Sequence, residues 1–123
     1  MANSTAANLG GLPPGIQDKL NSVKLSYLIE EAENKTYRVE LYMPLAGSLD
    51  TIYYKTLSGT CTLNVEIDGT SVTSWSALSV TSTEANTAST GADTWAGGES
   101  LTLIVTSNSS ALELQITILG TLT

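Results

Sequence analysis

From Val23 to the end of the chain, hydrophobic and polar residues alternate in short runs, and this period of two limits the possible folds most strongly. The clearest run is CTLNVEI, residues 61–67, in which every second residue is hydrophobic. Such alternation predicts a β-strand with one buried and one solvated face. No helical periodicity of useful length competes with it, so we expect an all-β chain.

Turn residues separate these runs at intervals of about ten residues, which is typical of a β-sandwich or jelly roll. Asp68-Gly69 is the strongest signal, because glycine tolerates the positive φ of a type I′ hairpin turn. The sequence therefore predicts about eight antiparallel strands, of which residues 101–105 and 112–118 are the most central. The runs lie at residues 23–29, 37–43, 49–56, 61–67, 70–73, 78–80, 101–105 and 112–118, with turns at 30–35, 47–48, 58–59, 68–69, 96–98 and 108–110; residues 84–94 form either a weak strand or a long loop.

The first 22 residues lack this alternation and predict an extended N-terminal arm, which leaves residues 23–123 as a single β-sandwich domain. Gly10-Gly11 and Pro13-Pro14-Gly15 are typical of a segment without its own core. Twenty extended residues reach roughly 65 Å, so the arm is either a disordered tail or a strap on a neighbouring subunit. Its candidate anchors, hydrophobic residues in an otherwise polar segment, are Leu12, Pro13, Pro14 and Ile16.

The charge and composition exclude several functional classes. A formal charge of −7 would repel a phosphate backbone, so we expect no nucleic-acid partner. The chain has no histidine and one cysteine, which leaves no histidine base and no intrachain disulfide. The first residues lack a secretory signal, and no hydrophobic run approaches the ~20 residues that span a bilayer. We expect synthesis in a cytoplasm and no membrane association.

No constellation in the sequence predicts catalysis, a cofactor or a metal ion. Glu30, Glu31 and Glu33 form the one acidic cluster, which indicates a solvated turn or, alternatively, a weak calcium site. Asp68 is explained by its hairpin turn, and Cys61 falls on the hydrophobic face of its strand, where a small buried residue is expected. We therefore expect a protein that is not an enzyme.

Three aromatic residues are candidates for contact with a partner. Trp75 and Trp95 fall in loop-like stretches, where they either fill the core or an interface or, alternatively, stack on a sugar. Tyr53 and Tyr54 place one ring on each face of their strand. If Tyr54 enters the core, Tyr53 faces outward and is available to a neighbouring subunit.

Three stretches resemble small β-sandwich domains in structural proteins of tailed bacteriophage particles. They are GTCTLNVEIDGTSV at residues 59–72, ALSVTST at 77–83 and AGGESLTL at 96–103, and the resemblance spans roughly residues 39–119. These motifs consist mostly of turn and core residues, so they bear on the fold more than on the role. The resemblance implies head decoration or cement proteins, head fibres or tail components, often trimeric, and offers no catalytic residue.

The resemblance and the residues together predict a virion structural protein. Its expected role is that of a decoration or cement protein that binds the major capsid protein on the outside of the phage head and stabilises the shell, as a homo-oligomer, with a trimer favoured. Many weak contacts suffice for such a protein, since multiple copies multiply the binding. The alternatives are a tail or fibre module that recognises cell-surface glycan, and a head–tail or baseplate connector.

Overall fold

The computed structural model describes residues 21–123, so the predicted arm anchors Leu12, Pro13, Pro14 and Ile16 lie outside the described residues. The first strand of the described residues begins at Ser22. The strands of the described part pair antiparallel in one continuous sheet, which confirms the all-β prediction. They are β1 (Ser22–Glu31), β2 (Lys35–Met43), β3 (Gly47–Lys55), β4 (Ser58–Ile67), β5 (Thr70–Ser71), β6 (Leu78–Val80), β7 (Ala85–Ala88), β8 (Thr94–Trp95) and β9 (Glu99–Leu122).

The long strand β9 organises the sheet, because it pairs along both of its edges and over both of its halves. On one edge, its first half pairs with β2 and its second half with β1. On the other edge, the same two halves pair with β4 and β3. The sheet therefore consists of three long ribbons side by side, residues 22–43, 99–122 and 47–67, with β9 in the middle.

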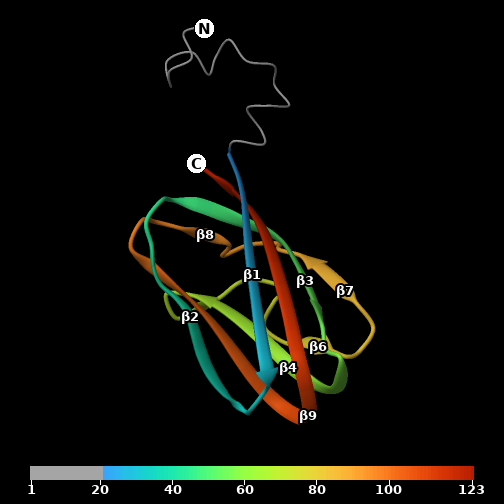
Figure 1. Cartoon of the computed structure of the whole chain (residues 1–123). Coiled ribbons are helices and arrows are strands. Elements are labelled where there is room, and N and C mark those ends of the chain that lie inside the picture. Colours follow the sequence, from blue (N-terminus) through green and yellow to red (C-terminus); the bar gives the residue numbers. More distant parts are fainter. Residues whose placement is uncertain (1–20) are drawn as a thin grey trace, which may run out of the picture.

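All three ribbons fold over at the same level, and this fold turns one sheet into two packed layers. The first ribbon bends at residues 32–34, the third at residues 56–59, and β9 at residues 107–113. Figure 1 shows the first half of β9 running down to this bend and the second half running back up from it. One layer contains β2, the first half of β9 and β4; the other contains β1, the second half of β9 and β3.

Backbone geometry and two asparagines stabilise the bend of β9. Ser107, Ser110 and Glu113 adopt φ between 49° and 54°, and positive φ lets the strand turn without losing its partners. Asn108 reaches the first ribbon: its Nδ2 donates to the carbonyl of Ala32 at 2.7 Å, and its backbone N–H donates to Asn34 Oδ1 at 2.8 Å. The bends of the two ribbons are thus hydrogen-bonded together.

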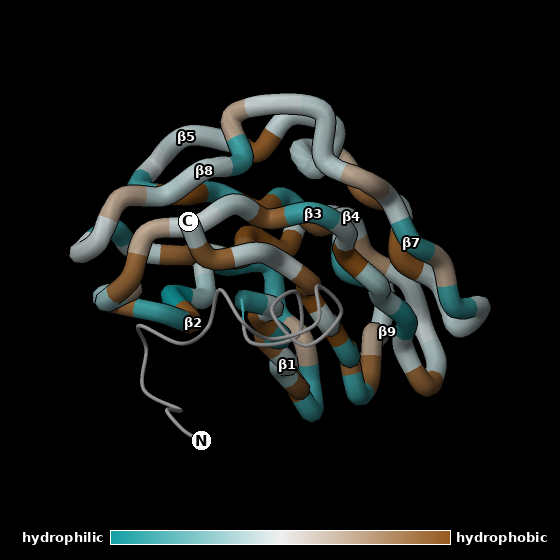
Figure 2. The backbone as a smooth tube through the Cα atoms, turned by 90° about the horizontal axis from the view of Figure 1, so that it is seen from above, coloured by the Kyte–Doolittle hydropathy of each residue, from teal (hydrophilic) through white to brown (hydrophobic). Residues whose placement is uncertain are grey.

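The core lies between the two layers and is built by the predicted alternation. Inward-facing residues of both halves of β9 are almost fully buried, as are those of β3 and β4. Figure 2 shows hydrophobic and hydrophilic residues alternating along the backbone of these strands. The largest fully buried side chains are Trp75, Leu49, Ile52, Leu63, Leu101, Leu103, Leu114, Ile116 and Ile118, with Val65, Val72 and Val80.

Several turn predictions are confirmed, and two are wrong. Asp68 and Gly69 have φ of 49° and 88°, as a type I′ turn requires. The expected turn at residues 108–110 does not end a strand, because it is the bend inside β9. Gly47 and Ser48 do not form a turn either; they begin β3, paired with both β8 and the end of β9.

Strand predictions need smaller corrections. The alternation predicts Leu41 on the buried face of its strand, yet its side chain is 75% exposed. The register of β2 against β9 shifts between Glu40 and Met43, so the alternation slips and only Met43 is buried. The segment 84–94, for which the sequence allows strand or loop, contains both: β7, then a loop, then the first residue of β8.

We predict that Gly59→Ala destabilises the domain much more than Gly69→Ala. Both glycines have positive φ, which costs alanine about 1–2 kcal/mol. A Cβ at Gly59 would also lie 2.1 Å from the backbone oxygen of Ser110 at the bend, whereas a Cβ at Gly69 meets nothing within 4 Å. The Gly59 variant should lose at least about 2 kcal/mol more in urea unfolding. Equal losses would contradict the role assigned to the bend.

Candidate functional site

The two sides of the sandwich differ, and residues 21–123 close only one of them. On the closed side, β6 extends the layer that contains β4, and β7 extends the layer that contains β3. Loop residues next to these two strands connect the layers by backbone hydrogen bonds. Thr73 N–H donates to the carbonyl of Gly91 at 2.9 Å, and Thr56 N–H donates to the carbonyl of Thr81 at the same distance. On the other side, β1 and β2 are edge strands, and within residues 21–123 each pairs only with β9.

Trp75 and Trp95 belong to the core, and neither ring is available as a partner surface or a sugar platform. Trp75 is fully buried on the closed side, where its Nε1 donates to the carbonyl of Thr87 at 3.1 Å. Trp95 is 4% exposed, and its Nε1 donates to the carbonyl of Leu45. The sequence allowed these two tryptophans to fill the core, to fill an interface or to stack on a sugar. Because both rings are buried, they fill the core, and their prediction as partner-binding residues is corrected.

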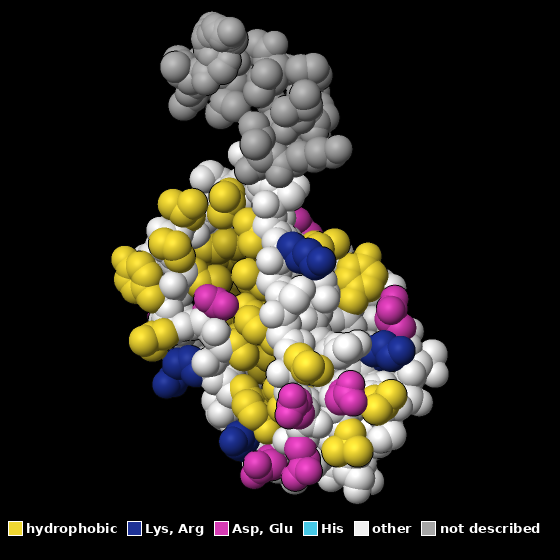
Figure 3. Space-filling view, in the orientation of Figure 1, with side chains coloured by type: hydrophobic (Ala, Val, Ile, Leu, Met, Phe, Trp, Pro, Cys, Tyr) yellow, Lys and Arg dark blue, Asp and Glu magenta, His cyan; other side chains and the backbone are white. Residues whose placement is uncertain are grey.

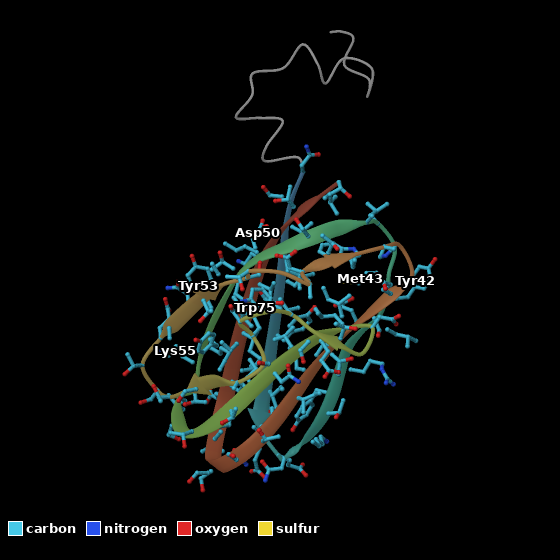
Figure 4. All side chains as sticks on the ribbon, turned by 180° about the vertical axis from the view of Figure 1, so that it is seen from behind. Tyr42, Met43, Asp50, Tyr53, Lys55 and Trp75 are labelled. Carbon is cyan, nitrogen blue, oxygen red and sulfur yellow. The ribbon has the colours of Figure 1, made fainter. Side chains whose placement is uncertain are left out.

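Tyr53 lies where the sequence predicts it, on the outer face of its layer. Tyr54 is buried and its hydroxyl is 2.9 Å from Thr87 Oγ1, so Tyr53 faces outward and is half-buried. It lines a hollow with Lys55, Glu84 and Gln115. Figure 4 shows Tyr53 toward the outside of the molecule and Trp75 in its interior, so these two candidates do not form one site.

A hydrophobic surface runs between the two edge strands on the open side. Its residues pack against the core but stay partly exposed: Leu25, Tyr27 and Ile29 on β1, and Tyr37 and Val39 on β2. We call these five residues the apolar seam. Figure 3 shows hydrophobic side chains gathered in a stripe over the area between β1 and β2. The seam is therefore the place where the core reaches the surface.

Three strongly exposed hydrophobic residues lie at the far end of β2 and just after it. Leu41, Tyr42 and Leu45 are 75%, 65% and 61% exposed. The Tyr42 ring lies over Gly98, where an added Cβ would come within 3.2 Å of it. Single exposed leucines are ordinary, but a group of large hydrophobic residues beside an open core edge indicates a protein interface.

Sequence reasoning missed these three residues, although a signal is present. LYMPL, residues 41–45, contains five consecutive hydrophobic residues and so breaks the period of two. A strand of this sandwich cannot bury both of its faces, so part of such a run must be exposed. The interruption of the pattern, rather than the pattern itself, marks the surface.

One polar contact bridges the two edge strands across the seam. The Tyr27 hydroxyl donates to Glu40 Oε2 at 3.0 Å. Burial raises the pKa of the Tyr27 phenol well above its usual value, and the hydrogen bond to the negative Glu40 raises it further. The Tyr27 hydroxyl therefore gives the Glu40 carboxylate a hydrogen-bond donor within a hydrophobic surface and connects β1 to β2.

The chemical groups that could support catalysis are few in the described part. Cys61 is buried, as expected, and burial raises the pKa of its thiol, which disfavours the reactive thiolate. Among residues 21–123, no three His, Cys, Asp or Glu side chains come together as a possible metal site. In the same range, no helix has the length and hydrophobicity needed to cross a membrane.

Comparisons with known proteins give one match. No protein-family model and no curated protein matches the chain. Among solved structures, it is similar to a chain of the "Cyanophage Pam1 capsid asymmetric unit", with a TM-score of 0.47 and 20% sequence identity. The alignment covers 83% of this chain and 79% of that chain. A likeness at this level assigns no role to the present chain.

We predict that Tyr27→Phe reduces the loss of stability at alkaline pH. A phenol whose folded pKa is raised stabilises the fold fully below its unfolded pKa of about 10, and this contribution disappears as the pH rises above that value. Urea unfolding at several pH values from about 8 to 11 should show a shallower decline for the variant. The variant should also lose about 1 kcal/mol near pH 7, because it lacks the hydrogen bond to Glu40.

The quantity to compare is the difference in unfolding free energy between wild type and Tyr27→Phe at each pH, rather than the pH dependence of either protein alone. Other tyrosines contribute equally to both and cancel. Parallel declines in wild type and variant would contradict the assigned contact between Tyr27 and Glu40.

Proposed function

We propose that this protein is a structural component of a tailed-phage virion, specifically a decoration or cement protein on the outside of the head. The observation that carries the proposal is the apolar seam, together with the exposed Leu41, Tyr42 and Leu45. A core edge left open over the length of two strands suits a protein partner better than a small molecule. The resemblance of residues 59–72, 77–83 and 96–103 to phage β-sandwich domains supplies the class of particle.

The proposed mechanism is shell stabilisation by mass action. A protein that binds only the assembled shell shifts the equilibrium toward that shell, and repeated copies make weak individual contacts sufficient. The partners we propose are the major capsid protein and further copies of this chain, as a trimer. The arm, with Leu12, Pro13, Pro14 and Ile16, would clamp the shell while the sandwich forms the external knob.

We also propose that the protein is not an enzyme. The chain contains no histidine, and its one cysteine is buried. Within the described residues, every buried side-chain nitrogen or oxygen has a hydrogen-bond partner. The alternative of a glycan-binding tail or fibre module, which would use Trp75, Trp95 or exposed tyrosines, loses its two tryptophans and retains Tyr42 and Tyr53.

We predict that particles lacking this protein lose their nucleic acid at a lower temperature than complete particles. Adding the purified full-length chain should restore the release temperature, as measured with a dye that fluoresces on released nucleic acid. A chain with Leu12→Asp and Ile16→Asp should fail to restore it, because charged side chains cannot pack into a hydrophobic contact. A chain with Ser4→Asp and Thr5→Asp adds the same charge and should restore it.

Identical release temperatures with and without the protein would contradict the decoration role. Full activity of the Leu12 and Ile16 variant would contradict the clamp alone. Binding to a glycan array, together with an unchanged particle, would favour the tail or fibre alternative.

A further inference from the structure

The unpaired edges of β1 and β2 border the apolar seam from both sides. Their 10 and 9 residues correspond to roughly 30 Å of backbone at about 3.3 Å per residue. Within residues 21–123, neither edge meets another strand on its outer side. Long edges of this kind are templates for strand addition, and proteins usually shorten, cover or distort them.

The direction of the two strands permits one of them to pair with the other in a second copy. β1 runs toward the bend at residues 32–34, and β2 runs away from it (Figure 1). When two copies lie side by side with their bends at the same end, β1 of one and β2 of the other are therefore antiparallel. This arrangement continues a layer of one copy into a layer of the next.

The outward charges of the two edges are complementary in this arrangement. Lys35 and Arg38, two of the four described cations, are exposed near the bend end of β2. Glu30 and Glu31 are exposed near the bend end of β1. The side chain of Arg38 makes no ion pair within residues 21–123, so its charge is free for a carboxylate of another copy. Opposite charges across paired strands favour that pairing.

We propose that copies of this chain assemble through their open sides, with β1 of one copy pairing with β2 of the next. Such pairing occupies both edges and covers the apolar seam, including Tyr27, Ile29, Tyr37 and Val39. Pairing of β1 with β1 would leave β2 and half of the seam exposed. The contact joins two different edges, so a closed ring uses every edge once.

This inference deepens the proposed homo-oligomer and rests on that part of the proposed function, but it needs no phage shell. It is tested with the purified full-length chain alone. Failure of the edge pairing is therefore seen in solution, whereas failure of the decoration role is seen on particles.

The first experiment reverses charges. Light scattering over a concentration series should show an oligomer whose dissociation constant rises by about tenfold or more for Arg38→Glu and for Glu30→Arg, because each places like charges together. The double variant should recover most of the affinity. Lys55→Glu, a charge reversal of the same size on β3, should leave assembly unchanged, and circular dichroism checks that each variant is folded.

The second experiment identifies the strands in contact. Chains carrying Glu30→Cys are mixed with chains carrying Arg38→Cys under mild oxidation, and the buried Cys61 is left in place in both. A disulfide between the two different chains is the expected product. Glu66→Cys on β4 replaces Glu30→Cys in the control mixture and should give none.

Five results would decide whether β1 of one copy pairs with β2 of the next. A monomer at all concentrations, or an oligomer insensitive to the charge reversals, overturns the proposal. Disulfides only between two Glu30→Cys chains overturn it as well, since they indicate pairing of β1 with β1. Mixed disulfides in a three-copy assembly support both the pairing and the proposed trimer. Mixed disulfides in a two-copy assembly support the pairing and contradict the trimer.

Discussion

The bend that folds three ribbons at one level is the constraint on which the rest of the structure depends. Without it, β1–β2, β9 and β3–β4 would form a flat three-ribbon sheet with no interior. Positive φ at Ser107, Ser110 and Glu113 allows the reversal of β9. Asn108 supplies hydrogen bonds to the neighbouring ribbon that the bent backbone cannot make with regular geometry. The two-layer core follows from this bend.

Folding one sheet in half leaves two sides, and residues 21–123 close only one of them. The long connection after β4 carries Trp75 into the core and covers the side of β6 and β7. The chain between β1 and β2 is a three-residue turn, too short to cover anything. The edges and the apolar seam are thus open because the connection on their side is short, whereas the connection on the other side is long. They give the domain a surface suited to protein contact.

Local sequence chemistry identified where the chain changes direction. It did not distinguish a hairpin turn between two strands from a bend inside one strand. Asp68-Gly69 joins two neighbouring strands, as expected, because its residues tolerate the dihedral angles of a hairpin turn. Asn108-Ser109-Ser110 has similar chemistry, yet it lies inside one continuous strand. Positive φ serves both geometries, and only the distant partners Ala32, Asn34 and Gly59 distinguish a bend from a turn.

The alternation of residue types by itself determined the antiparallel all-β class and the buried faces of β4 and of both halves of β9, because side chains on a strand point alternately to its two faces. The absence of histidine, a property of composition alone, likewise limited the chemistry open to the chain. Only the tertiary structure decided that both tryptophans are core residues, that Leu41 is exposed, and that β1 and β2 are edges. Each of these depends on which distant segment lies alongside, and local periodicity carries no information about that neighbour.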